Sequence, residues 1–191
     1  IDGGKSLQWI EDAGGKVVNL LCKGSLHHLE GQLKKTPEEH VSDILNAVQD
    51  ADSRGISVNL YLEDWSNGMI NSKEYIFFLL DALKDSVIKR YMLPDTLGIL
   101  NPANVGTFFE EMVSRFPDLH FDSHLHNDYD LAIGNTFSAI RGGAKGIHTT
   151  VNGLGERAGN TPLGSAVALI NDQLPEYKCH VNEAQLNKLS N

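Results

Sequence analysis

The sequence predicts an α/β fold in which successive strand–helix units build a parallel β-sheet. Short apolar runs indicate strands, and they begin near residues 17, 56, 88, 119 and 145. Between consecutive runs, apolar residues recur with the spacing of an amphipathic helix. Strands that alternate with helices pair in parallel, because each helix returns the chain to the same end of the sheet. The length of 191 residues, 41% of them apolar, suits one core of this kind.

The N-terminal elements are a short helix, a strand and an irregular segment. Residues 6–13 indicate a helix that ends at the glycine pair 14–15. Residues 16–22 form a nearly continuous apolar run, which fits a strand buried on both faces. Residues 23–35 are expected to form a loop or a broken helix.

A capping box at Thr36 begins the next helix. Thr36 is the N-cap, Pro37 occupies the first helical position, and Glu39 reaches back to the cap. The helix ends at Gly55 and is followed by a strand at residues 56–63. The residues that it is expected to bury are Val41, Ile44, Leu45 and Val48.

The same alternation continues along the rest of the chain. A helix after Ser72 has apolar residues at helical spacing, namely Ile76, Leu79, Leu80 and Leu83. Further strands are predicted at residues 88–93, 119–125 and 145–151. Further helices are predicted to begin near Asn101, Asn127, Thr161 and Glu183.

Polar residues follow each predicted strand at its C-terminal end. They are residues 23–25, 63–64, 95–96, 124–126 and 152 onward. Chemistry is found at these ends both in open doubly wound sheets and in (β/α)₈ barrels. Polar ends on consecutive strands favour a barrel mouth over a single crevice, and no nucleotide-binding glycine motif follows the first strand. The pattern therefore favours a (β/α)₈ barrel.

Charge and composition exclude several classes of partner. The chain has 16 basic and 25 acidic residues, and its net charge of −9 argues against nucleic acid. A run of 18 or more apolar residues would indicate a membrane span, and none is present. Cys22 and Cys179 are far apart and no signal-peptide pattern begins the chain. We expect a cytoplasmic protein whose partners are small molecules.

His124 and His126 are the first candidate metal ligands. Alternate residues of a strand point to the same face, so both imidazoles project together from the end of the strand at residues 119–125. Such a pair is half of a divalent-metal site, although a hydrogen-bonded pair at a strand end is an equally good interpretation. Asn127 and Asp128 follow, either as a helix cap or as partners that orient the imidazoles.

A glycine-rich loop at residues 152–160 makes the histidine motif more specific. His-Leu-His-Asn-Asp at 124–128, followed by Gly-Leu-Gly-Glu-Arg-Ala-Gly-Asn at 153–160, resembles the acyl-CoA-condensing metalloenzymes of the 2-isopropylmalate, homocitrate and citramalate synthase family. Members are TIM barrels that join acetyl-CoA to a 2-oxo acid. The resemblance implies that a divalent metal binds to His124, His126 and Asn160. Zn, Mn, Co and Mg all suit these ligands.

The resemblance also implies that residues 1–191 are a partial TIM-barrel catalytic domain. The predicted strands match the last five of the family's barrel, so three strands are expected before Ile1. A C-terminal subdomain is expected after Asn191. The fourth metal ligand, an Asp on the family's first strand, and a partner histidine would lie in these parts. The full-length protein is expected to be a homodimer, and the chain alone to be inactive.

Two further site residues follow from the resemblance. Glu63 corresponds to the active-site carboxylate that takes part in proton transfer, although by itself it is interpreted as a solvated loop acid. Thr96 corresponds to the threonine whose hydroxyl binds the carboxylate of the 2-oxo acid, with a turn-stabilising role as the alternative. Asp64, next to Glu63, should face the other way and be structural.

The acceptor is expected to be pyruvate, which would make the full-length protein an acyltransferase that forms citramalate. Tyr61 lies on the strand face of Glu63 and, with Leu20 or Leu21 of the preceding strand, should narrow the pocket. The usual 2-isopropylmalate synthase carries a smaller serine in the place of Tyr61. Selection by apolar volume is modest, about 1–3 kcal/mol per methylene. Synthesis of 2-isopropylmalate from 2-oxoisovalerate, in leucine biosynthesis, is therefore the alternative.

Two other functions are compatible with parts of the sequence. A metal-dependent lyase on the same barrel, such as an HMG-CoA lyase, resembles this chain at His-x-His but not at Gly-Glu-Arg-Ala-Gly-Asn. A noncatalytic fragment with an incomplete metal site is the other possibility. Metal content and acetyl-CoA-dependent release of CoA distinguish it from a condensing enzyme.

Overall fold

The computed structural model describes residues 4–189 of the chain. It divides into two compact units. The described part of the first unit is residues 4–94 and 115–121, and that of the second is residues 95–114 and 122–189. The last two residues of the helix expected from Glu183 lie outside the described residues, as do residues 1–3.

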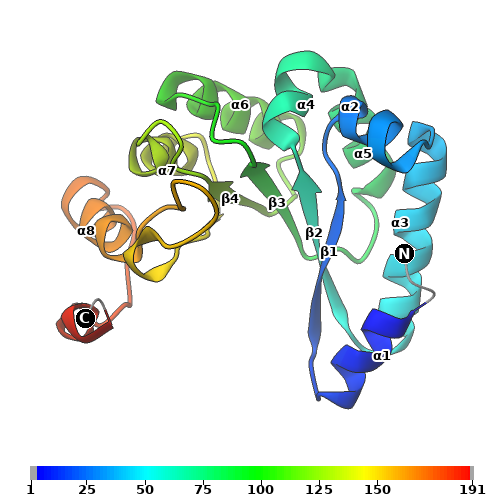
Figure 1. Ribbon diagram of the computed structural model, residues 1–191, viewed down its shortest axis with the longest axis horizontal. Helices are drawn as coiled ribbons and strands as arrows, with labels where there is room; N and C mark the ends of the chain where they lie inside the picture. The colour runs from blue at the N-terminus through cyan, green and yellow to red at the C-terminus, as the bar shows by residue number, and fades with distance from the viewer. Residues whose placement is uncertain (1–3, 190–191) are drawn as a thin grey trace. The chain divides into compact units, whose positions relative to one another are not determined.

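The strands of the first unit are β1 (Val17–Lys23), β2 (Ser57–Glu63) and β3 (Arg90–Asp95), although Asp95 itself belongs to the second unit. β1 and β2 pair in parallel over their whole length, and β2 pairs in parallel with β3. The Tyr91 N–H of β3 donates to the carbonyl of His120, directly before the next strand of the chain. In this unit the structure confirms the parallel strand–helix repeat that the sequence predicts (Figure 1).

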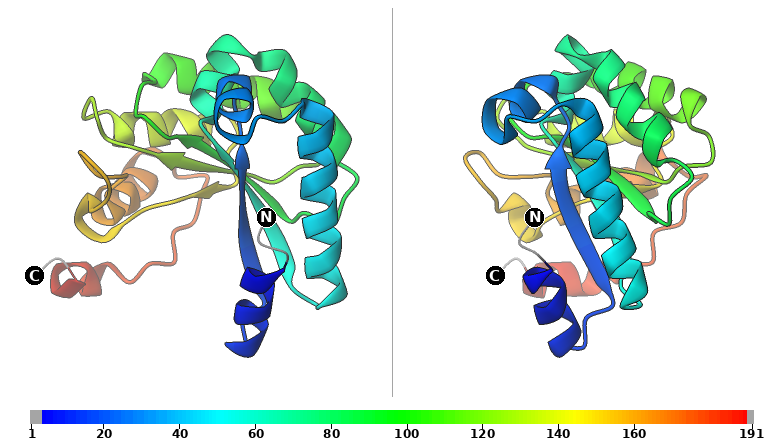
Figure 2. Two further views of the ribbon diagram at one scale, coloured as in Figure 1. Left: turned by 45° about the vertical axis from the view of Figure 1, so that its right-hand side comes forward. Right: turned by 90° about the vertical axis from the view of Figure 1, so that its right-hand side faces the viewer.

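Helices alternate with these strands along the first unit. They are α1 (Lys5–Asp12), α2 (Leu26–His28), the π-helical turn η1 (Leu29–Leu33), α3 (Pro37–Ser53), α4 (Trp65–Asn71) and α5 (Lys73–Leu83). α3 runs alongside the β1–β2 pair and contacts both β2 and α5 (Figures 1 and 2). α2 lies at the carboxyl end of β1, and α1 lies at the opposite end (Figure 1).

The capping box that begins α3 is confirmed. The Thr36 hydroxyl accepts a hydrogen bond from the Glu39 N–H at 3.2 Å, and the Glu39 carboxylate accepts one from the Thr36 N–H at 2.8 Å. The arrangement satisfies two backbone donors that the first turn of a helix otherwise leaves unpaired. The predicted end of the helix is also confirmed, because Gly55 has a positive φ of 67°.

α3 buries a face that is rotated from the predicted one. Ile44 and Val48 are buried as expected, but Val41 is half-buried and Leu45 is 38% exposed. The prediction was therefore wrong for these two residues. Their place on the buried face is taken by His40, whose Nε2 accepts the Lys23 N–H at 3.1 Å, and by Ala51. A buried imidazole is tolerated here because it is hydrogen-bonded.

Gly68 of α4 is required by a close approach of two backbone segments. A Cβ on Gly68 would overlap the carbonyl oxygen of Gly24 and lie 2.8 Å from Cδ1 of Ile76. Because a backbone carbonyl cannot move without shifting the end of β1, we expect Gly68→Ala to lower the free energy of unfolding by about 3 kcal/mol. Denaturant unfolding measures this change. Gly31→Ala is the control, since a Cβ there meets nothing within 4 Å, and an equal loss in both variants would contradict the explanation.

The second unit contains the strands β4 (Phe121–Leu125), whose first residue belongs to the first unit, and β5 (Gly146–Ile147), which pair in parallel. Its helical segments are α6 (Pro102–Arg115), α7 (Ala132–Arg141), η2 (Val151–Gly153), α8 (Leu163–Gln173), η3 (Glu183–Gln185) and α9 (Leu186–Leu189). Arg115, the last residue of α6, falls in the first unit. α7 contacts both β5 and α8. Among residues 4–189, none of the helices combines the length and apolarity needed to cross a bilayer.

β5 is shorter than the strand predicted at residues 145–151. The His148 N–H still donates to the Ser123 carbonyl of β4 at 2.9 Å, but the chain then leaves this pairing. The Thr150 N–H donates instead to the carbonyl of Thr161, and the chain turns into η2. The apolar alternation continues past the point where the backbone changes its hydrogen-bonding partner, and this caused the overlong prediction.

Candidate functional site

One face of the β1–β2 pair carries three of the predicted site residues. In the parallel register Leu21 lies opposite Tyr61, and Lys23 lies opposite Glu63. The Lys23 ammonium forms an ion pair with the Glu63 carboxylate at the ends of the two strands. On the other face β2 presents fully buried residues, which are Val58, Leu60 and Leu62. Leu21, rather than Leu20, therefore shares a face with Tyr61 and Glu63.

Asp64 is structural, as the sequence predicts. It is 1% exposed, and its carboxylate accepts hydrogen bonds from the Ser25 hydroxyl at 2.6 Å and from Nδ2 of Asn67 at 2.7 Å. Its φ of 66° lies in the left-handed region, which a non-glycine residue adopts only when its surroundings hold it there. These bonds hold the backbone turn that ends β2 directly after Glu63.

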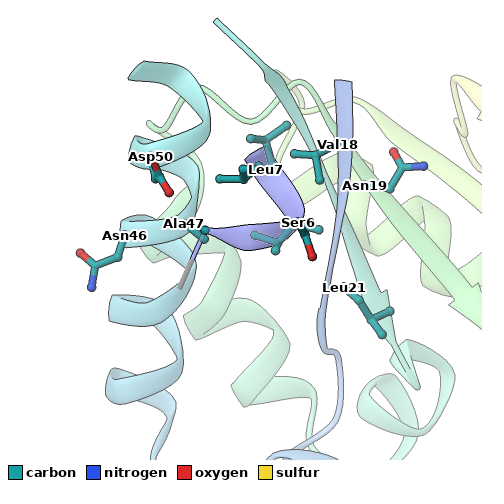
Figure 3. A pocket seen from close by; sticks show the side chains of 11 residues that line it. Ser6, Leu7, Val18, Asn19, Leu21, Asn46, Ala47 and Asp50 are labelled. Atoms are coloured by element: carbon teal, nitrogen blue, oxygen red, sulfur yellow. The ribbon is translucent and has the colours of Figure 1, made fainter. Parts of the chain in front are cut away.

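A cavity of about 590 Å³ lies beside β1 in the first unit. Side chains from α1, β1 and α3 surround it, including those of Leu7, Val18, Leu21, Ala47 and Asp50 (Figure 3). Neither Tyr61 nor Glu63 lines it. The cavity is therefore not the acceptor pocket that the sequence predicts around these two residues.

The three predicted metal ligands form one cluster in the second unit. The rings of His124 and His126 have their centroids 5.2 Å apart, and Nε2 of His124 lies 3.4 Å from Nδ2 of Asn160. A backbone bridge joins His126 to Asn160. His126 is 6% exposed and Asn160 is 7% exposed, whereas His124 is half-buried.

Arg157 holds the glycine-rich loop beside the histidine motif. Its Nε and Nη2 donate to the two carboxylate oxygens of Asp128 at 2.7 and 2.8 Å, and Nη2 also donates to the Thr96 carbonyl at 2.9 Å. The Asn127 N–H donates to the Gly159 carbonyl at 3.0 Å, and Oδ1 of Asn127 accepts a backbone N–H of α7. The second unit thus brings Thr96 to the loop that carries Asn160.

Burial favours the neutral form of both imidazoles of the histidine motif. It lowers the pKa of His124 to about 4, and the neighbouring His148 and His126 rings add to this effect. Burial, followed by the nearby Arg157 guanidinium, also lowers the pKa of His126. A neutral imidazole keeps one ring nitrogen as an electron-pair donor, which is the form that binds a metal.

These residues fit a divalent metal as part of a site. Nδ1 of His126 is buried and has no hydrogen-bond partner among the described residues. A metal ion bound at this nitrogen would supply the partner that the described residues do not. Among residues 4–189 no group of three or more His, Cys, Asp or Glu side chains forms a metal cluster. The set here is two imidazoles and the amide of Asn160, which would have to present Oδ1 to the metal.

His148 belongs to this cluster, although the sequence interpretation missed it. Its Nδ1 lies 3.2 Å from Nδ1 of His124, and its Nε2 lies 3.6 Å from the carboxylate of Asp122. β4 and β5 pair with Ser123 opposite Ile147, so His148 follows opposite His124. Two histidines at equivalent positions of neighbouring parallel strands are the signal that could have predicted this contact.

Relatives of this chain are found among the HMGL-like proteins and the homocitrate synthases. The HMGL-like family matches residues 5–191. A homocitrate synthase of Sulfolobus acidocaldarius is 35% identical over 163 residues, which are 85% of this chain and 33% of that protein. A homocitrate synthase of Sulfurisphaera tokodaii is 38% identical over 162 residues, 85% of this chain and 34% of that protein. The chain spans about a third of the length of these curated relatives.

Solved structures with the same fold are more distant in sequence. The HMG-CoA lyase of Bacillus subtilis matches 97% of this chain with a TM-score of 0.82 and 22% identity, over 65% of its own length. The carboxyl transferase domain of Rhizobium etli pyruvate carboxylase matches 96% of this chain with a TM-score of 0.73 and 15% identity, over 29% of its own length. These likenesses confirm the predicted fold class, part of a TIM barrel.

Proposed function

Because this chain belongs to the HMGL-like family and is similar to homocitrate synthases, we propose that the protein that contains it condenses acetyl-CoA with a 2-oxo acid. The observation that carries this proposal is the cluster of His124, His126 and Asn160. Burial lowers the pKa of both imidazoles, and Nδ1 of His126 has no hydrogen-bond partner among the described residues. Arg157 holds the loop that bears the third member of the cluster beside the histidine motif.

Each predicted site residue has one role in the proposed reaction. A divalent metal held by His124, His126 and Asn160 would act as a Lewis acid on the carbonyl of the 2-oxo acid. The Thr96 hydroxyl would bind the acceptor carboxylate. The Glu63 carboxylate would take part in removing a proton from the acetyl methyl group, so that the enolate carbon can bond to the acceptor carbonyl. Water then cleaves the thioester and releases CoA.

We propose pyruvate as the acceptor, which gives citramalate. The support comes from the face of β2 that carries Glu63, where the phenol ring of Tyr61 takes up volume and Leu21 lies opposite it in the register. A branched acceptor such as 2-oxoisovalerate needs more room at this point. Each excluded methylene changes the discrimination by about 1–3 kcal/mol, or roughly 10–200-fold in kcat/KM.

A dicarboxylic 2-oxo acid is the second candidate acceptor. The name of the matched relatives, homocitrate synthase, corresponds to 2-oxoglutarate as the acceptor. Lys23 adds to this possibility, because its ammonium lies on the face that carries Tyr61 and Glu63 and could receive a second carboxylate.

The acceptor is tested by comparing three 2-oxo acids at saturating acetyl-CoA. We expect kcat/KM for pyruvate to exceed that for 2-oxoisovalerate by about 10-fold or more. Tyr61→Ser should narrow this ratio by enlarging the pocket, whereas Tyr177→Ser, a change at an exposed tyrosine, should leave it unchanged. Preference for 2-oxoglutarate, lost in Lys23→Met, would establish the second candidate and overturn pyruvate.

A further inference from the structure

The imidazole rings of His148 and His124 approach each other through their Nδ1 atoms. The two Nδ1 atoms are 3.2 Å apart, and the rings meet edge to face at 80° with their centroids 5.4 Å apart. A hydrogen bond between two neutral imidazoles requires one Nδ1 to carry a proton and the other to accept it. With both rings neutral, the pair therefore has two arrangements, and they leave Nε2 of His124 in opposite states.

The surroundings favour the arrangement in which His124 is the donor. Its Nε2 then carries the electron pair of the ring, and this nitrogen lies 3.4 Å from the amide of Asn160. His148 then carries its proton on Nε2, which lies 3.6 Å from the Asp122 carboxylate. The partial positive charge of this N–H is attracted to the carboxylate. In the other arrangement, an electron pair on Nε2 of His148 would face the negatively charged Asp122 carboxylate.

We propose that His148 is a positioning residue that holds the proton of His124 on Nδ1 and thereby keeps Nε2 of His124 open to the metal. The chain of contacts runs from the Asp122 carboxylate through His148 to His124. Partners of this kind fix the tautomer and orientation of a metal-binding imidazole. The inference rests on the proposed metal site, because it assigns His148 its role toward that site.

The backbone holds this chain of groups in place from both sides. The His148 N–H donates to the Ser123 carbonyl at 2.9 Å, which keeps His148 level with His124 across the two strands. Asp122 is 2% exposed, and its carboxylate fills the space in which a Cβ on Gly146 would lie. Glycine at this position thus leaves room for the acid that faces Nε2 of His148.

The tautomer of His124 tests the proposal without any metal or substrate. Long-range ¹H–¹⁵N spectra of the metal-free protein, labelled with ¹⁵N-histidine, distinguish a protonated Nδ1 from a protonated Nε2. We expect His124 to carry its proton on Nδ1 in the wild type and in His148→Gln, whose amide can accept from His124 and donate to Asp122. In His148→Leu the Nδ1 signature should be lost. A wild-type His124 protonated on Nε2 would overturn the proposal.

Metal affinity supplies the second readout. Calorimetric titration with Zn²⁺ should show binding weakened by about 10–100-fold in His148→Leu and by no more than about 3-fold in His148→Gln. His180→Leu, at an exposed histidine of the same unit, is the control. Equal affinity of His148→Leu and wild type would overturn the proposal. If the wild type bound no metal, the proposed function would fail, whereas the tautomer of His124 would still decide the role of His148.

Discussion

The His126→Gln variant is expected to lose both divalent-metal binding and condensation activity. His126 is buried, and its Nδ1 has no hydrogen-bond partner in the part of the chain that the structure describes. Removing a ligand should weaken metal affinity by at least about 100-fold, the upper range for removing a partner of a ligand. The metal contributes several kcal/mol to the transition state, so kcat should fall about 10³-fold. Calorimetric titration with Zn²⁺ and an assay of CoA release measure the two effects.

His180→Gln is the matched control for this experiment, because His180 is exposed and lies in the same unit. It should retain metal affinity and activity. Thermal unfolding of both variants checks that the loss of metal affinity and activity in His126→Gln does not come from unfolding. Wild-type metal affinity in a folded His126→Gln protein would show that His126 is not a metal ligand.

The Glu63→Gln variant is expected to retain metal binding and lose condensation. Glutamine has nearly the shape of glutamate but cannot accept a proton, and general base catalysis contributes about 10²–10⁴-fold to a rate. We therefore expect kcat to fall by this factor while the affinity for Zn²⁺ stays within error of the wild type. A wild-type rate in Glu63→Gln would show that the assignment is wrong.

The Lys23–Glu63 ion pair requires two controls. Glu74→Gln makes the same chemical change at an exposed acid of α5 and should leave kcat unchanged. Lys23→Met removes the partner of Glu63 and retains the carboxylate. If Glu63→Gln and Lys23→Met lost the same activity and stability, Glu63 would act as a structural partner of Lys23 and not in proton transfer.

The alternation of strands and helices could be predicted because apolar residues recur with a different spacing in each kind of element. The α5 positions chosen by their helical spacing, Ile76, Leu79, Leu80 and Leu83, are all buried. α4 could not be predicted in this way, because it is short and Gly68 interrupts its pattern. Its N-cap is Asp64, whose left-handed backbone is held in part by a hydrogen bond from Ser25, which is distant in the chain. Sequence spacing contains no information on such bonds.

The candidate site was predictable where one element carries the residues. His124 and His126 share a strand face, and Tyr61 shares one with Glu63, so period-2 alternation was enough to group each pair. The Lys23–Glu63 pair depends on the register between strands, which the sequence of either strand alone does not specify.

His148 is a second case of this kind. The contact of His148 with His124 depends on the register of β4 and β5. β5 ends at Ile147, so His148 lies just outside the strand. The resemblance to condensing enzymes supplied Asn160, whereas the contact that orients His124 is visible only when the two strands are paired.

The most direct measurement is the release of CoA from acetyl-CoA by the protein that contains this chain, assayed with a thiol reagent. It should be made with and without pyruvate, and with and without a metal chelator. We expect release that requires both the 2-oxo acid and a divalent metal, with one citramalate formed for each CoA. Release that proceeds without a 2-oxo acid, or equally well in chelator, would contradict the proposed function, as would its absence with all the 2-oxo acids compared above.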